Sequence, residues 1–169
     1  MSELNELYQS IILDHNRRPR NFGELADATG RAQGKNPLCG DEVTVWVKVE
    51  DDMISEIAFR GVGCAISRAA ASLMTTAVKG KTRAEAEEIF GRFHQVVTGK
   101  VARDAAEKME KSIAVFSGVS KFPVRVKCAV LPWHTLRSAL EDGGDPDKVV
   151  SSEREGPAGP DAALTGGGA

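Results

Sequence analysis

Alternating apolar and polar residues predict two strands in the first half of the chain. Four valines occupy every second position from Val43 to Val49, which is the period of a half-buried strand. An acidic turn at 50–52 follows, and Ile57 and Phe59 then resume the alternation. Two short alternating runs joined by a polar turn are typical of a β-hairpin.

Apolar residues at helical spacing predict helices on both sides of this hairpin. Ser2 can cap the first helix, whose apolar stripe reaches Ile12. A second, alanine-rich helix begins at or just after Cys64 and is closed by Gly80. The dipole of this helix favours a thiolate at its first turn.

The second half of the chain predicts three more helices. A capping box at 82–85 starts one of them, and another is expected from Ala105 to Gly118. We predict that Pro132 opens the last helix, which runs through Leu140. Cys128 would then lie near a helix end or a break, where its side chain can project into a cleft.

Composition predicts one compact domain and argues against a nucleic-acid-binding or membrane-spanning protein. A chain of 169 residues with 41% hydrophobic side chains can form a core without a metal ion. Its 22 basic and 24 acidic residues leave no positive excess for nucleic acid, and no apolar run approaches the roughly 20 residues of a membrane span. The N-terminal region does not resemble a signal peptide, so we expect a cytoplasmic protein.

The end of the chain differs from the rest in composition. From Gly143 onward it consists largely of Gly, Pro, Ser, Asp and Ala, with almost no large apolar residues. Such a segment cannot bury enough apolar surface to fold. We therefore predict a folded domain over residues 1–142 and a disordered tail over 143–169.

Three cysteines and one nearby carboxylate are candidate metal ligands: Cys39, Asp41, Cys64 and Cys128. An odd number of cysteines without an export signal is typical of a reducing compartment, where thiols act as ligands or nucleophiles. These thiols are not paired as CxxC, so they can meet only in the folded core, which favours a reactive site over a structural one. The alternative is that they are three unrelated small core residues.

The chemistry of these four residues suits zinc. Three thiolates and a carboxylate carry more negative charge than Zn²⁺ neutralises, which keeps the sulfurs nucleophilic. Asp41 is a harder and more exchangeable ligand than a fourth cysteine would be. The loop of Cys39, with Pro37 before it and Gly40 after it, is expected to be the most mobile of the three cysteine settings.

Three sequence motifs resemble those of a known family. The motifs are Asn36-Pro37-Leu38-Cys39-Gly40-Asp41, Gly61-Val62-Gly63-Cys64-Ala65-Ile66-Ser67, and Gly118-Val119-Ser120-Lys121-Phe122-Pro123 running on to Lys127-Cys128. With these motifs, the chain resembles the IscU/NifU-like iron–sulfur cluster assembly proteins, specifically the SufU branch. The resemblance covers roughly residues 4–140 and implies an α+β fold in which a small antiparallel sheet packs against several helices (SufE/NifU-like).

Two features indicate the SufU branch. IscU-like scaffolds have a histidine immediately before the last cysteine, whereas this chain has Lys127, which is not a soft-metal ligand while protonated. The segment between Lys79 and Gly118 also resembles the insertion that marks SufU proteins. Both features favour zinc-dependent sulfur transfer, and the alternative is a scaffold on which an iron–sulfur cluster is assembled directly.

The resemblance implies partners and a role for one cysteine. A cysteine desulfurase of the SufS type would supply a histidine to the zinc, release Cys39 and transfer its persulfide sulfur to that thiolate. Cys64 and Cys128 would stay on the metal, and iron–sulfur assembly proteins would take the sulfur next. A third possibility is a purely structural zinc site with inert thiolates.

Other polar residues are weaker candidates. Arg125 could orient Asp41 or bind the partner, and it could equally be an ordinary surface arginine. His15, His94 and His134 lie outside the motifs, so we expect them on the surface or on helix faces and not among the ligands.

Overall fold

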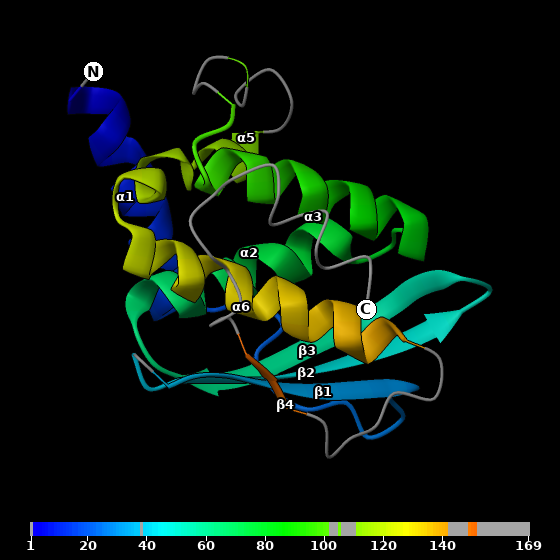
Figure 1. Ribbon diagram of the computed structural model, residues 1–169. Helices are drawn as coiled ribbons and strands as arrows, with labels where there is room; N and C mark the ends of the chain where they lie inside the picture. The colour runs from blue at the N-terminus through cyan, green and yellow to red at the C-terminus, as the bar shows by residue number, and fades with distance from the viewer. Residues whose placement is uncertain (1, 38, 102–104, 106–110, 142–148, 152–169) are drawn as a thin grey trace, which may run out of the picture.

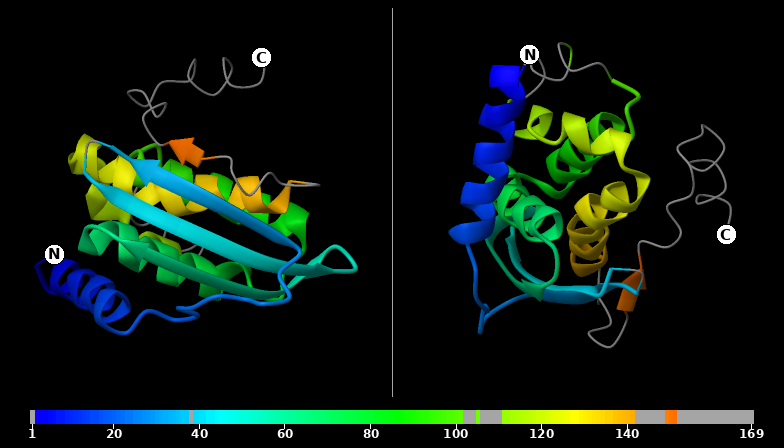
Figure 2. Two further views of the ribbon diagram at one scale, coloured as in Figure 1. Left: turned by 90° about the horizontal axis from the view of Figure 1, so that it is seen from below. Right: turned by 90° about the vertical axis from the view of Figure 1, so that its left-hand side faces the viewer.

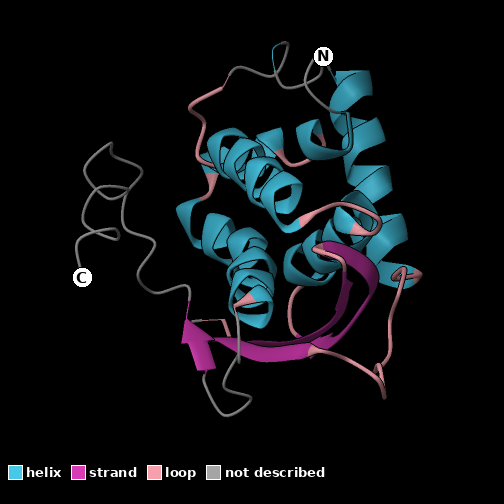
Figure 3. Ribbon diagram, turned by 90° about the vertical axis from the view of Figure 1, so that its right-hand side faces the viewer, coloured by secondary structure: helices cyan, strands magenta, loops and turns pink. Residues whose placement is uncertain are grey.

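The computed structural model describes residues 2–37, 39–101, 105, 111–141 and 149–151. Its elements in chain order are α1 (Ser2–Arg17), β1 (Gly30–Asn36), β2 (Asp41–Glu50), β3 (Met53–Val62), α2 (Ala65–Val78), α3 (Arg83–Val97), α5 (Lys111–Ala114), the 3-10 helix η1 (Ser117–Lys121), α6 (Pro123–Leu140) and β4 (Val149–Ser151). The strands form one sheet in the order β3-β2-β1-β4, and the helices lie on one side of it (Figures 1 and 3). The predicted α+β class is confirmed.

The helices form two layers over the sheet. Helices α2 and α6 pack directly on the strands, and α1 lies against α2. Helix α3 forms a further layer beyond them (Figure 1) and is joined to α6 by the rings of Phe93 and Trp133, whose centroids are 5.1 Å apart. The described part of the segment expected as an insertion thus adds an outer helical layer above α6.

The predicted hairpin is confirmed as β2 and β3. The two strands pair antiparallel, with Val45 opposite Phe59, and the alternate valines at 43–47 are buried beneath the helices. Asp51 and Asp52 have φ values of 52° and 64°, which is the left-handed conformation that a tight two-residue hairpin turn requires. Figure 2 shows the opposite face of this sheet in its left view.

Strand β1 was not predicted, because its sequence lacks an apolar alternation. It pairs antiparallel with β2 in the stretch before Cys39, for which the sequence predicted no helix or strand. A Cβ on Gly30 would collide with the carbonyl oxygen of Ala139, and one on Gly34 with the hydroxyl of Thr135. The glycines therefore let α6 lie close against β1, which brings the N-terminal half of α6 near the β1–β2 turn.

Strand β4 makes the sheet mixed and not purely antiparallel. It pairs parallel with β1, with Gln33, Gly34 and Lys35 opposite the residues 149–151. These three residues belong to the segment predicted to be disordered, so the prediction is wrong for them. The rest of that segment lies outside the described residues, and the domain boundary at 142 stays a prediction.

The helix starts at Cys64 and at the capping box are confirmed. Cys64 is the N-cap of α2, and Gly80 follows the end of that helix with a φ of 82°. At α3, the Thr82 hydroxyl accepts the N–H of Glu85 at 3.1 Å, and the Glu85 carboxylate accepts the N–H of Thr82 at 3.1 Å. In the stretch expected to be helical from Ala105 to Gly118, the described residues include a short helix at 111–114.

The predicted start of the last helix was wrong. Helix α6 begins at Pro123, at the position where proline suits a first turn, and Pro132 lies inside it. Cys128 is therefore in the second turn of a continuous helix and not at its end. Because Pro132 has no N–H, it cannot donate to the carbonyl four residues earlier, which is that of Cys128.

Candidate metal centre

The four candidate ligands converge from four elements. Cys39 lies in the β1–β2 turn, Asp41 is the first residue of β2, Cys64 caps α2, and Cys128 projects from α6. The Sγ atoms of Cys39 and Cys128 and a carboxylate oxygen of Asp41 lie within 4.8 Å of one another. The two sulfurs are 3.5 Å apart, and Cys64 Sγ is 3.6 Å from Asp41 Oδ2. The predicted residues therefore come together in the core.

Asn36 organises the turn that carries Cys39. Its carbonyl oxygen accepts the N–H of Cys39 at 3.2 Å and that of Gly40 at 2.8 Å, and Gly40 has a φ of 71°. Its side chain is fully buried, and Nδ2 lies 3.9 Å from Cys128 Sγ. In the sequence, Asn36 stands out only as the first residue of a motif. That motif was the available signal, since nothing in the residue type alone indicated a role.

Asp41 is a fully buried carboxylate with defined partners. Its Oδ1 accepts the backbone N–H of Cys64 at 2.7 Å, while Oδ2 faces the Cys64 sulfur. A Cβ on Gly63 would collide with this carboxylate, and Gly63 has a φ of 145°. A buried carboxylate is costly unless hydrogen bonds or a cation compensate it. The donor set around it, three sulfurs, fits a soft or borderline cation.

The thiols of Cys64 and Cys128 differ in acidity. A hydrogen bond from Cys128 and the N–H of Ser67, which lies 3.4 Å from Cys64 Sγ, lower the pKa of Cys64 to about 6, although burial and Asp41 oppose the shift. For Cys128, the hydrogen bond to Cys64 and burial raise the pKa. Both shifts favour negative charge on the Cys64 sulfur, which lies at the N-terminus of α2, where the helix dipole also favours it.

Arg125 faces Cys64. Its guanidinium lies on the exposed side of the centre, and the negative charge and hydrogen bond of Cys64 raise the pKa of Arg125. The other roles considered for Arg125, namely orienting Asp41, binding a partner or being an ordinary surface arginine, stay predictions, whereas the charged neighbours that shift its pKa are the cysteines. Phe122 and Val124, beside it at the start of α6, are 60% and 55% exposed, so the rim of the centre presents apolar surface.

The histidines lie elsewhere in the described part of the chain. His15 Nδ1 is 2.8 Å from the Ser72 hydroxyl. His94 and His134 pack edge-on against the ring of Phe90. None of the three belongs to the candidate ligand group found among the described residues.

A match to a protein family was found over most of the chain. A family described as the NifU-like N terminal domain matches residues 7–129, which include all four candidate ligands. The chain belongs to this family. Its members thus share the segment in which the four elements of the centre converge.

Similar members of the NifU-like N-terminal family carry two different names. The zinc-dependent sulfurtransferase SufU of Bacillus subtilis (strain 168) is 39% identical over 146 residues, covering 85% of this chain and 97% of that protein. An iron–sulfur cluster assembly scaffold protein IscU of Streptococcus pyogenes serotype M1 is 40% identical over 141 residues, covering 83% and 87%. Identity of this size does not by itself distinguish between the two named functions.

Solved structures of related proteins have the same fold. A SufU from Fervidobacterium islandicum AW-1, named as an iron–sulfur cluster assembly scaffold protein for the SUF system, is 37% identical with a TM-score of 0.71, covering 78% of this chain and 94% of that one. A NifU-like protein from Brucella abortus is 22% identical with a TM-score of 0.69, covering 80% and 93%, and supports the fold alone.

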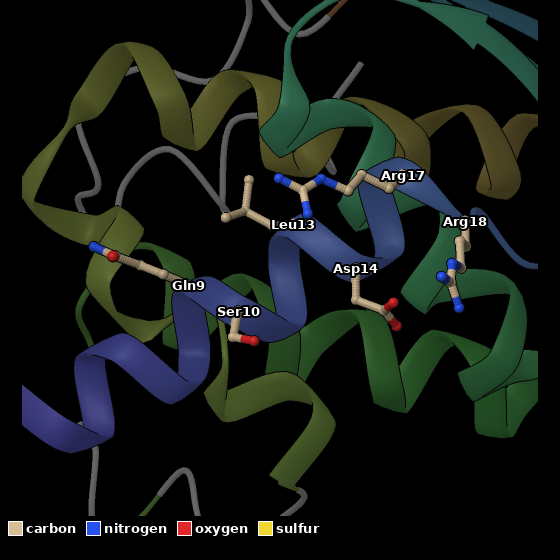
Figure 4. Close-up of a pocket in the computed structure, with 6 residues that line it drawn as sticks. All are labelled: Gln9, Ser10, Leu13, Asp14, Arg17 and Arg18. Atoms are coloured by element: carbon tan, nitrogen blue, oxygen red, sulfur yellow. The ribbon is translucent and has the colours of Figure 1, made fainter.

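The hollows found among the described residues include two larger ones that lie outside the centre. One of about 540 Å³ lies between α1, η1 and the start of α6, has a mostly apolar lining that includes Ile12, Ile66 and Phe122, and reaches Arg125. The other, of about 420 Å³, lies along α1 between Gln9 and Arg18 (Figure 4). Neither is lined by a candidate ligand.

Among the described helices, none combines the length and apolarity that crossing a membrane requires.

Proposed function

We propose that this chain is a zinc-dependent sulfur-transfer protein of iron–sulfur cluster assembly. Cys39, Asp41, Cys64 and Cys128 are its zinc ligands, and Cys39 accepts the sulfur from a cysteine desulfurase of the SufS type. The observation that carries the proposal is the convergence of three thiols on one buried carboxylate. Four such donors match the coordination number that zinc prefers.

The donor set fits a zinc ion that serves reactivity and not only the fold. The folded chain already has an apolar core spread over both helix layers, so it does not need a metal ion for its fold. When bound, zinc would hold the cysteines as thiolates and keep them nucleophilic. Three thiolates and Asp41 leave the centre net negative, which favours exchange of one ligand for a neutral donor.

The position of Cys39 suits it for leaving the metal. Cys64 caps helix α2 and Cys128 lies within α6, whereas Cys39 lies in a turn held by two N–H bonds to the carbonyl of Asn36. A turn residue can move without unfolding a helix. The other anchor of the centre, the bond from the Cys64 N–H to Asp41, does not involve this turn.

The transfer step is a thiol exchange without net oxidation. The freed Cys39 thiolate attacks the terminal sulfur of the desulfurase persulfide, a new S–S bond forms on Cys39, and the desulfurase cysteine leaves as a thiolate. The desulfurase would supply a histidine in place of Cys39, as the family resemblance implies. Iron–sulfur assembly proteins would then receive the sulfur from Cys39.

The second candidate function is a scaffold for direct cluster assembly, since several relatives are named IscU. Lys127 argues against it, because a protonated amine next to Cys128 replaces a ligand that such scaffolds provide. Protein purified without added metal separates the two. We expect about one zinc per chain and little acid-labile sulfide. Iron with stoichiometric sulfide, and no zinc, would establish the scaffold instead.

A further inference from the structure

Strand β4 meets the sheet directly beside the metal centre. It occupies the edge of β1, and its pairing with β1 ends where Ser151 lies opposite Lys35. The next residue of β1 is Asn36, which holds the turn of Cys39 through its carbonyl oxygen. The backbone of the turn is therefore one residue away from the β4 contact.

The two edges of β1 hold the turn from opposite sides. On one edge, Asn36 pairs with Asp41 of β2. On the other edge, β4 pairs with β1 at Gln33 to Lys35, and it also lies against α6, which carries Cys128 (Figure 3). Loss of β4 would leave the last residues of β1 paired on one side only. A strand that is paired on one side opens more readily than a strand that is paired on both sides.

The β4 contact is small enough to open. It consists of three residue pairs in parallel register, and the side chain of Val149 is 47% exposed. Few buried contacts and few ladder hydrogen bonds give a local opening free energy well below that of the whole domain. The contact can therefore change while the fold stays intact.

We propose that β4 is a positioning element for Cys39: its pairing restrains the Asn36 turn, and its release makes Cys39 more mobile. Cys64 is the natural internal reference, because it caps α2 and is fixed by hydrogen bonds with Ser67 and Asp41. The effect on sulfur transfer rests on the proposed function, whereas the effect on the mobility of the turn does not. β4 would thus set how readily Cys39 leaves the centre.

The test disrupts β4 in the full chain. The N–H groups of successive strand residues point to opposite edges, so the double variant Val149→Pro/Val150→Pro removes whichever donor faces β1. The matched control is Arg154→Pro/Glu155→Pro, which places the same number of prolines beyond β4. Zinc-loaded proteins are treated with iodoacetamide, labelling of each cysteine is followed by mass spectrometry, and hydrogen exchange is measured over residues 33–40.

We expect the strand variant to label Cys39 about threefold faster or more, with faster exchange over 33–40, while labelling of Cys64 and the zinc content stay at the control level. Equal rates at Cys39 in both variants would overturn the proposal. A parallel rise at Cys39 and Cys64 with loss of zinc would also overturn it, since the whole centre and not the turn would then depend on β4. None of these readouts requires a desulfurase, so they stand even if Cys39 never accepts sulfur.

Discussion

Oδ1 of Asp41 accepts the backbone N–H of Cys64 at 2.7 Å, so the first residue of β2 is fixed to the N-cap of α2. One carboxylate thereby has two tasks: it positions the helix start that carries a thiolate, and it offers its second oxygen to the centre. Gly63 makes this approach possible, since any side chain there would collide with the carboxylate. The two tasks can be separated by substitution.

Asp41→Ala and Asp41→Asn are expected to differ. Alanine leaves the Cys64 N–H without its acceptor, which costs about 1–3 kcal/mol of folding free energy, whereas asparagine keeps an oxygen acceptor and removes only the charge. We expect both variants to retain part of the zinc and to stimulate a cognate desulfurase less than their zinc content predicts. Urea unfolding, metal analysis and desulfurase assays measure the three effects. Full stimulation by Asp41→Ala would show that Asp41 is not a working ligand.

Removal of the metal is expected to lower the melting temperature substantially. The candidate ligands lie on the β1–β2 turn, β2, α2 and α6, so a bound ion links elements that are far apart in the sequence. Differential scanning calorimetry before and after chelation, and again after zinc is restored, measures the effect. A melting transition that chelation leaves unchanged would mean that these elements do not share a metal.

Sequence patterns predicted the parts of the fold that have a strong period or a cap. The alternation at 43–59, the N-cap at Cys64 and the capping box at Thr82 depend on local chemistry, which one sequence displays. Strand β1 was not predicted, because its glycines are explained by the close packing of α6 and its sequence has no apolar alternation. The start of α6 was misplaced because two prolines could open it, and only packing against β1 shows that the helix continues through Pro132.

The sequence predicted the candidate ligands of the centre but not the residues and contacts that hold them in place. Cysteine and aspartate are recognisable as candidate metal ligands from their residue type alone. The structure brings the four candidate ligands together. Asn36 and the β4 contact act through backbone hydrogen bonds and register, which residue type does not reveal. Whether the four residues bind zinc stays a prediction that metal analysis decides.

Gly30→Ala is expected to destabilise the protein by about 1–3 kcal/mol, because the new methyl group would meet the backbone carbonyl of Ala139 and push α6 away from β1. Gly91→Ala is the matched control, since nothing lies within 4 Å of a Cβ at that position in α3. There alanine should be neutral or stabilising by up to about 1 kcal/mol, from its higher helix propensity. Chemical unfolding of both variants measures the difference. Similar stabilities would contradict the close packing of α6 on β1.

The contribution of His15 to stability is expected to depend on pH. Burial and the charge of Arg20 lower the pKa of His15 below its ordinary value of 6.5. The unfolded chain therefore binds the proton more readily, so this contribution is complete above pH 6.5 and is lost as the pH falls through that value toward the lower folded pKa. His15→Asn, which stays neutral beside Ser72, should lose less stability than wild type between pH 7.5 and about 5.5. Identical pH profiles in urea unfolding would rule out this effect of His15.

Replacing each of the three cysteines by serine is expected to have different effects on zinc binding and on sulfur acceptance. Cys64 caps α2 and Cys128 lies within α6, so neither can leave the centre without disturbing a helix, and either substitution should remove zinc and sulfur acceptance together.

Cys39→Ser should retain part of the zinc, because Asp41, Cys64 and Cys128 remain, but it should accept no sulfur. Each protein is mixed with desulfurase and cysteine, and persulfides are mapped by mass spectrometry. In wild type the added sulfur of 32 mass units, about one atom per chain, should appear on Cys39. Label found mainly on Cys64 or Cys128, with Cys39 unmodified, would move the acceptor into a helix and contradict the mobile-turn argument on which the role of Cys39 depends.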